Sequence, residues 1–171
     1  QKGMVGRSIR LMIVGIPNVG KSSFINRMAQ SKKAKVEDRP GVTRTKQWVK
    51  IGDQMELLDM PGVLWPKFDD QEVAKRLAFT GAIKDDIMDL ESLAMLLLEF
   101  LAERYPKALE ARYKMQVSDA DSGLQLLEQL GRKRGMLISG GEVNYERAAI
   151  TVLDEFRSGT LGRLTLELPE A

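Results

Sequence analysis

Cysteine and histidine are both absent from the 171-residue sequence. Without cysteine the chain forms neither disulfide bonds nor thiolate metal sites, and without histidine it lacks the commonest general base and zinc ligand. These absences exclude histidine-containing catalytic triads and zinc enzymes of the usual kinds. Any chemistry must therefore come from carboxylates, hydroxyls, amides, basic side chains and the backbone.

Long apolar runs are also lacking. The richest stretch, residues 90–101, is interrupted by Glu91, Ser92 and Glu99, whereas a membrane span needs about 20 continuous apolar residues. Residues 1–10 contain no apolar segment of the kind that secretory signals carry. The sequence therefore predicts a soluble, cytoplasmic protein with no membrane partner.

Charge is unevenly distributed along the chain. Residues 1–80 contain 15 Lys and Arg against 8 Asp and Glu, a net charge of +7, while residues 81–171 contain 11 against 16, a net charge of −5. With 43% hydrophobic residues, a chain of this length can bury one core and a small second one. The basic half suits phosphate or RNA as a partner, but an ordinary solvated surface explains it equally well.

The first half of the chain alternates strands and helices. Residues 9–14 are mostly apolar and stop at a glycine, as a buried strand does, and residues 21–29 place apolar side chains on one helical stripe. The polar, basic segment 31–45 predicts a mobile loop. Residues 47–51 and 55–58 are expected to form the two strands of a hairpin. This order predicts an α/β domain.

The second half is predicted to be helical. A helix over residues 71–80 is expected to close a first domain of residues 1–82, and residues 83–171 would form a small helical domain. The remaining predicted elements are helices over residues 90–101 (stopped by Pro106), 122–130 and 143–157, and a short strand or extended tail over residues 162–168.

A phosphate-binding loop follows the first predicted strand. Residues 15–22 read Gly-Ile-Pro-Asn-Val-Gly-Lys-Ser, which matches the pattern G-x-x-x-x-G-K-[ST] between a strand and a helix. Backbone N–H groups and the helix start can surround phosphate oxygens, Lys21 can neutralise the β and γ phosphates, and Ser22 can bind Mg²⁺. An accidental glycine turn is the alternative. The residues expected to bind nucleotide here are Asn18, Val19, Gly20, Lys21, Ser22 and Ser23.

A second motif, Asp59-Met60-Pro61-Gly62, comes at the end of the third predicted strand. At this place P-loop proteins carry an acidic residue that binds Mg²⁺, and GTPases carry the motif D-x-x-G. Asp59 can hold Mg²⁺ through water, and the Gly62 N–H can approach the γ-phosphate. Such a tetrapeptide alone would be only a turn, but its position after a strand and a phosphate loop favours the magnesium interpretation.

Residues 39–45, Arg-Pro-Gly-Val-Thr-Arg-Thr, look like the first switch of a GTPase. The threonine of that switch closes onto Mg²⁺ when a γ-phosphate is present. Thr43 is the preferred metal ligand and Thr45 is the alternative. A polar connecting loop without a ligand is the third interpretation.

The chain as a whole resembles the circularly permuted GTPases that act in assembly of the bacterial large ribosomal subunit. The motifs that carry this resemblance are residues 15–22, Pro40-Gly41-Val42-Thr43, Asp59-Met60-Pro61-Gly62 and Ser139-Gly140-Gly141. The resemblance implies a P-loop GTPase-type three-layer domain followed by a small helical domain. It also implies GTP or GDP and Mg²⁺ as ligands, and the large subunit with its ribosomal RNA, rather than DNA, as partner.

In that family the guanine-recognition motifs, Asn-Lys-x-Asp and a Ser-Ala-Lys-like loop, precede the phosphate loop. Neither motif occurs in this sequence. We therefore expect the GTPase domain to be incomplete here, so that the chain, which starts at Gln1, is a fragment or a naturally shortened relative. Its preference for guanine is implied by the resemblance alone.

The position after Gly62 departs from the common GTPase pattern. Many GTPases place there the glutamine that orients the attacking water, whereas this chain has Val63. An apolar side chain cannot polarise water, so the catalytic group is unknown and is expected from a missing segment, a partner such as the ribosome, or a monovalent cation. Asn18 stands where related GTPases use an asparagine to help bind K⁺; stabilising the loop turn is its alternative role.

The leading hypothesis is a GTP-hydrolysing assembly factor, slow without the ribosome, whose nucleotide state changes its affinity for the immature large subunit. The alternatives are a nucleotide-dependent binding module with little hydrolysis, and a P-loop ATPase or small-molecule kinase. The resemblance implies that the helical domain contacts ribosomal RNA, although its net negative charge argues against its being the main RNA surface. The candidate contacts are Arg132, Lys133, Arg134, Arg147, Arg157 and Arg163.

Overall fold

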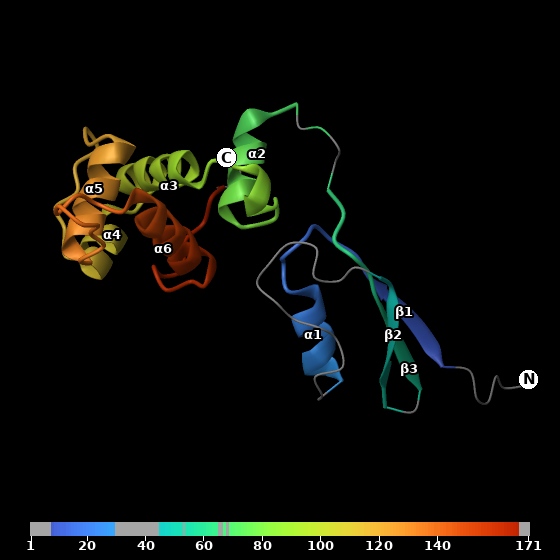
Figure 1. The fold of residues 1–171 in the computed structure, drawn as a ribbon. Helices are drawn as coiled ribbons and strands as arrows, with labels where there is room; N and C mark the ends of the chain where they lie inside the picture. The colour runs from blue at the N-terminus through green and yellow to red at the C-terminus, as the bar shows by residue number, and fades with distance from the viewer. Residues whose placement is uncertain (1–7, 30–44, 53, 65–66, 68, 168–171) are drawn as a thin grey trace, which may run out of the picture. The chain divides into compact units, whose positions relative to one another are not determined.

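The computed structural model describes residues 8–29, 45–52, 54–64, 67 and 69–167. The chain forms two compact units, one made of Gln1–Asp69 with Gly81–Lys84 and the other of Asp70–Thr80 with Asp85–Ala171. Figure 1 shows a small sheet with one helix in the first unit and a group of helices in the second. The sheet unit contains both predicted phosphate-binding motifs.

A three-stranded sheet forms the centre of the first unit, in the order β1-β3-β2 (Figure 1). β1 (Ile9–Ile13) runs parallel to β3 (Met55–Asp59), and β2 (Gln47–Ile51) runs antiparallel to β3. The predicted hairpin is therefore confirmed. Because β1 and β3 are parallel, their carboxyl ends lie at the same edge, which brings the loop after β1 close to Asp59.

The helix α1 (Lys21–Met28) covers one face of this sheet. Its Ile25 is completely buried and packs against Val49 and Leu57, which the pleat places on the same face of β2 and β3. The helix predicted over residues 21–29 is therefore confirmed. The loop predicted over residues 31–45 lies outside the described residues, apart from Thr45 in a bend.

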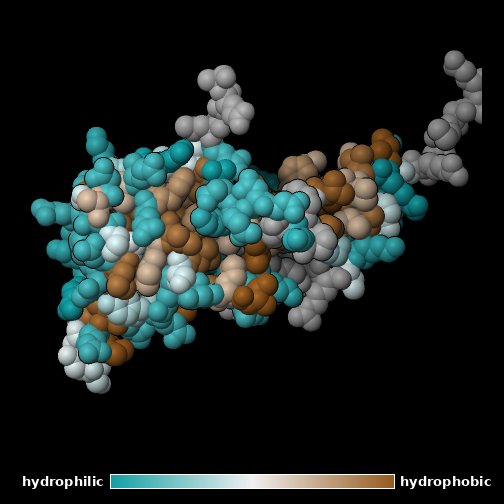
Figure 2. Space-filling view, turned by 90° about the horizontal axis from the view of Figure 1, so that it is seen from above, coloured by the Kyte–Doolittle hydropathy of each residue, from teal (hydrophilic) through white to brown (hydrophobic). Residues whose placement is uncertain are grey.

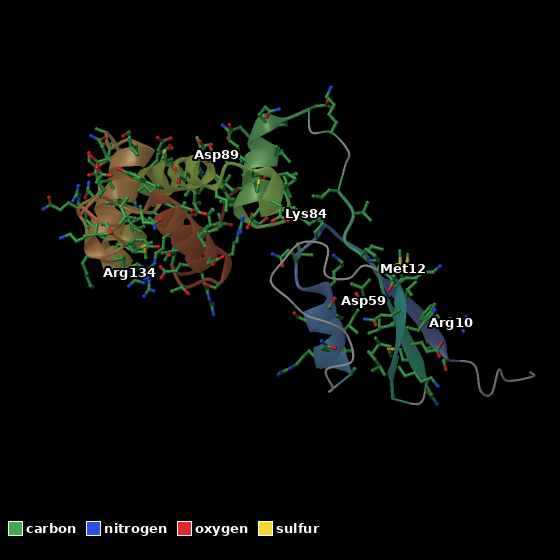
Figure 3. The ribbon with its side chains drawn as sticks, viewed as in Figure 1. Arg10, Met12, Asp59, Lys84, Asp89 and Arg134 are labelled. Carbon is green, nitrogen blue, oxygen red and sulfur yellow. The ribbon has the colours of Figure 1, made fainter. Side chains whose placement is uncertain are left out.

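The other face of the sheet and its β1 edge carry exposed apolar side chains. Ile9, Met12 and Val14 are 58%, 60% and 68% exposed, and Trp48 is 49% exposed. Among the described residues β1 pairs with β3 alone. Figure 2 shows apolar surface over this small unit, and Figure 3 shows Arg10 and Met12 on the side of β1 that faces away from α1.

The second unit is built from helices around a leucine-rich core. Its longest helix, α3, contacts α4, α5 and α6, and its Leu97, Leu98 and Leu101 are fully buried, which confirms the predicted leucine stripe as core. Among the described residues no helix is long and apolar enough to cross a membrane. The elements are α2 (Gln71–Phe79), a 3₁₀ turn (Asp85–Ile87), α3 (Leu90–Arg104), α4 (Pro106–Tyr113), α5 (Gly123–Lys133) and α6 (Tyr145–Arg157).

Two of these helices differ from the prediction. Pro106 stops α3 as expected, but it also begins α4, because a proline in the first helical turn has no N–H that would need an intrahelical partner. Val143 was predicted to start the last helix, yet it pairs with Leu137 in an isolated β-bridge and Asn144 caps α6. Of the two alternatives for residues 162–168, the strand does not form over the described residues 162–167.

The helix α2 belongs to the helical unit, which differs from the prediction that it closes the first domain at residue 82. It contacts α3 and α6. Arg157 of α6 donates to the carbonyl oxygens of Ala78 at 3.0 Å and Phe79 at 3.1 Å, and it forms a two-point ion pair with Asp85. The guanidinium thus satisfies carbonyls that the end of a helix leaves unpaired. These long-range bonds tie α2 to the helical unit, although Gly81–Lys84, which follow it, belong to the sheet unit.

A second arginine cluster joins α4, α5 and α6 around Glu155. Arg112 donates to both carboxylate oxygens of Glu155, at 2.9 Å and 2.5 Å, and Arg134 donates to one of them at 2.8 Å. The Glu155 side chain is only 13% exposed. The hydrogen bonds from Arg112, helped by the nearby charges, lower the pKa of Glu155 from its ordinary value despite its burial.

Replacement of Glu155 by glutamine is expected to destabilise the helical unit by about 2 kcal/mol at neutral pH, because two arginines lose a charged acceptor. A carboxyl with a lowered folded pKa stabilises the fold above its unfolded pKa, ordinarily 4.5, and this contribution disappears as the pH falls through the folded pKa. The loss caused by Glu155→Gln should therefore shrink on acidification below pH 4.5.

Urea unfolding followed by the near-ultraviolet circular dichroism of tyrosine measures this difference, because Tyr105, Tyr113 and Tyr145 all lie in the helical unit. Asp154→Asn is the matched control, since Asp154 is exposed on the same helix and forms no ion pair with the described residues. Equal stability of Glu155→Gln and Asp154→Asn at pH 7 would contradict the proposed contribution.

Candidate functional site

The loop between β1 and α1 has the shape of an anion site. Asn18 and Gly20 adopt left-handed backbone conformations, with φ of 59° and 85°, and Gly20 is the N-cap residue of α1. The N-cap residue Gly20 makes no side-chain hydrogen bond to the first turn of α1, and this turn contains no acidic residue. The positive end of the helix dipole therefore faces the loop. A Cβ atom at Gly20 would meet no atom of the described residues within 4 Å, so these residues leave the space beside the loop open.

Lys21 folds back over this loop. Its ammonium group donates a hydrogen bond to the Ile16 carbonyl oxygen at 2.5 Å. Burial lowers the pKa of Lys21, and the charge of Asp59 opposes that effect. A phosphate oxygen in the loop would offer the ammonium group a charged acceptor in place of a neutral carbonyl, which is the stronger interaction.

Asp59 is the buried carboxylate of the site. It lies at the end of β3, between the sheet and α1 (Figure 3), and is fully buried. The Ser22 hydroxyl donates to Asp59 Oδ2 at 3.0 Å, and the Gln47 amide nitrogen lies 3.5 Å from the same oxygen. Asp59 Oδ1 is buried without a hydrogen-bond partner among the described residues.

This arrangement fits the predicted magnesium site. A buried carboxylate oxygen without a partner is costly, and a hydrated Mg²⁺ ion would satisfy it. The structure brings Ser22 and Asp59 together, as the sequence predicted, whereas Thr43 lies outside the described residues. Ser22 and Asp59 would hold the ion, which when bound would neutralise charge on the phosphates.

The segment that follows Asp59 packs directly on the phosphate loop. A Cβ atom at Gly62 would lie 2.4 Å from the Pro17 Cα, so only glycine fits this approach. The next residue, Val63, donates its backbone N–H to the Gly15 carbonyl oxygen at 3.3 Å. Gly62 therefore lies at the loop, as its predicted role near the γ-phosphate requires.

An apolar hollow of about 430 Å³ adjoins the loop. Val63 is 71% exposed at this place, and no side chain of the described residues that line the hollow can polarise a water molecule. The lining therefore supplies no replacement for the glutamine of other GTPases. The lining residues are Val14, Gly15, Ile16, Met60, Pro61, Val63 and Leu64.

The conformation of Asn18 agrees with its alternative role. Asparagine tolerates the left-handed region better than most residues do, and Asn18 has a φ of 59°. This supports a function in shaping the loop. Its predicted contact with K⁺ stays a prediction.

The sequence and the fold of this chain match those of known proteins. Residues 10–129, which include the phosphate loop and the Asp59 motif, match the family described as 50S ribosome-binding GTPase. The chain belongs to this family. The predicted fold class, an α/β P-loop GTPase-type domain followed by a helical domain, is thereby confirmed.

Similar known proteins agree with the resemblance found in the motifs. Ribosome biogenesis GTPase A of Bacillus cereus is 50% identical over 169 residues, which are 99% of this chain and 57% of the relative. A GDP-bound structure of YlqF matches with a TM-score of 0.66 at 27% identity, over 96% of this chain and 63% of that chain. GNP-bound YlqF from T. maritima matches with a TM-score of 0.60 at 27% identity, over 94% and 60%.

The chain spans 57% to 60% of the length of the first curated relatives that it matches. The relatives contain further residues outside the matched region. The activity and the partners of a whole family member are therefore proposed for this chain below.

Sequence reasoning missed one polar residue of the site, Gln47. It is the register partner of Asp59 across the β2–β3 pair. The predicted hairpin contained this information, because residues 47 and 59 lie at equal distances from the centre of the turn between the two strands.

Proposed function

We propose that the protein binds and hydrolyses GTP with Mg²⁺ and acts as a nucleotide-dependent factor in assembly of the large ribosomal subunit in the cytoplasm. The observation that carries the proposal is the bond between Ser22 and the buried Asp59, next to a helix start whose N-cap residue is glycine. The names and bound nucleotides of the relatives support the choice of GTP and of ribosome assembly.

Each part of the site has a definite task in this proposal. The backbone of residues 18–23 and the Lys21 ammonium group hold the phosphates. Ser22, Asp59 and Thr43 hold Mg²⁺, and the Gly62 N–H contacts the γ-phosphate. Because Gly62 packs on Pro17, a ligand that displaces the loop would also displace Gly62, and this movement would serve as the switch.

Hydrolysis requires a group that orients water, and the apolar hollow around Val63 offers none. We therefore propose that turnover is slow in the isolated protein, and that the ribosome, further protein outside this chain or K⁺ near Asn18 supplies the missing function. The same hollow favours a second candidate, a nucleotide-dependent binding module with little hydrolysis.

Steady-state GTP turnover, measured alone and with large ribosomal subunits in KCl or NaCl, tests the proposal. We expect the protein alone to release phosphate slowly and to release it faster with the subunits. The Lys21→Ala variant gives the background rate of phosphate release. Nucleotide-dependent binding to the subunits without any stimulation would favour the binding module. Equal binding to the subunits with GTP, with GDP and without nucleotide would reject both.

Contacts with ribosomal RNA are proposed for a reduced set of the basic residues. Arg132, Arg134 and Arg157 form ion pairs with Glu128, Glu155 and Asp85, so their charges are partly satisfied within the unit. No ion pair within the described residues involves the other candidates, which would contribute most to phosphate binding and to its salt dependence. These are Lys133, Arg147 and Arg163.

A further inference from the structure

Gln47 and Ser22 approach the same oxygen of Asp59 from two different elements. Ser22, at the start of α1, donates to Oδ2 at 3.0 Å, and the Gln47 amide nitrogen on β2 lies 3.5 Å from Oδ2. The antiparallel register places Gln47 directly opposite Asp59. Gln47 is half-buried.

Two donors on one carboxylate oxygen fix the rotation of the carboxylate. With Oδ2 occupied by Ser22 and Gln47, the plane of the group is determined and Oδ1 is left buried without a partner among the described residues. If Gln47 did not contribute, the carboxylate could turn about its terminal torsion, which is intrinsically soft. Residues that orient a metal-binding carboxylate in this way control its affinity for the metal.

Gln47 is also the first residue of β2, and it follows Thr43 by four positions. It therefore connects two parts of the predicted metal site. Its backbone continues from the segment that contains Thr43, and its side-chain amide lies next to the Asp59 carboxylate. We infer that Gln47 is a positioning residue, which acts through Asp59 to orient the magnesium-binding carboxylate. This inference rests on the proposed function of the site.

The test is a titration of Mg²⁺ against the dissociation rate of a fluorescent GDP analogue from the purified protein. Gln47→Met removes the amide but retains an unbranched side chain of similar length and volume. We expect this variant to need about tenfold more Mg²⁺ for half-maximal slowing of release, an effect of the size found for other outer-shell residues. Affinity for the analogue without Mg²⁺ should stay within about twofold, because Gln47 would act only through the metal-binding carboxylate.

The matched control is Gln54→Met, the same substitution at an exposed position in the turn of the same hairpin. A double-mutant comparison with Asp59→Asn separates positioning from packing. If Gln47 acts through the carboxylate, Gln47→Met should have no further effect on the magnesium requirement of Asp59→Asn.

Three results would overturn the inference. These are an unchanged magnesium requirement in Gln47→Met, an equal loss of affinity with and without Mg²⁺, and effects of Gln47→Met and Asp59→Asn that simply add. Failure of the proposed function is distinguishable, because the unsubstituted protein would then bind the analogue without any dependence on Mg²⁺ or on Lys21.

Discussion

Replacement of Lys21 by alanine is expected to weaken binding of GTP and GDP by about 100-fold, or about 2.8 kcal/mol. The ammonium group lies over the phosphate loop, where it donates to the Ile16 carbonyl oxygen. In the bound state it would face phosphate oxygens in a partly desolvated place, where a charge-assisted hydrogen bond is stronger than one to a neutral carbonyl. Removal of this charge leaves only backbone N–H groups for the phosphates.

Equilibrium titration with fluorescent guanine nucleotides measures this loss. Lys50→Ala is the control, because Lys50 is an exposed lysine on β2 of the same unit and forms no ion pair with the described residues. Trp48 in β2 reports whether either variant disturbs the sheet. Wild-type affinity in Lys21→Ala would show that the nucleotide binds elsewhere on the protein.

Replacement of Asp59 by asparagine is expected to raise the Mg²⁺ concentration required for tight nucleotide binding by roughly 50-fold, while binding without Mg²⁺ changes little. Asparagine has the same shape and its amide oxygen still accepts a hydrogen bond from Ser22, so the packing around this buried position is retained. What is lost is the negative charge beside the buried Oδ1 position. Mg²⁺ binds carboxylate oxygens far better than amide oxygens.

The two affinities are obtained by titrating nucleotide in the presence of Mg²⁺ and in the presence of a chelator. Asp69→Asn serves as the control, since Asp69 is exposed, belongs to the same unit and forms no ion pair with the described residues. A loss of equal size under both conditions would mean that Asp59 stabilises the fold and does not hold the metal.

Local patterns in the sequence were sufficient to predict the part of the site that is built from local structure. The loop lies between one strand and the helix that follows it, and Asp59 ends a strand with a clear apolar pattern. Spacing along the chain fixes both. The approach of Ser22 to Asp59 then follows from the parallel pairing of β1 with β3.

Contacts between distant residues could not be predicted in this way. The assignment of α2 to the helical unit rests on its packing against α3 and α6 and on Arg157, which reaches the α2 carbonyl oxygens across 78 and 79 positions of sequence. A helical stripe shows that α2 has a buried face but not which unit covers it. The sequence likewise does not predict the orientation of the Asp59 carboxylate, because this orientation results from side-chain donors on two different elements.

The exposed strand β1 has a consequence for the behaviour of the protein in solution. Its side chains Ile9, Leu11 and Met12 are 58%, 43% and 60% exposed, and Arg10 is the sole charged residue within the strand. Edge strands of this composition can pair with the edges of other molecules, and a single charge is a weak barrier against such stacking. Among the described residues the unpaired edge of β1 is therefore the place where a further strand can add to the sheet, however stable the helical unit is.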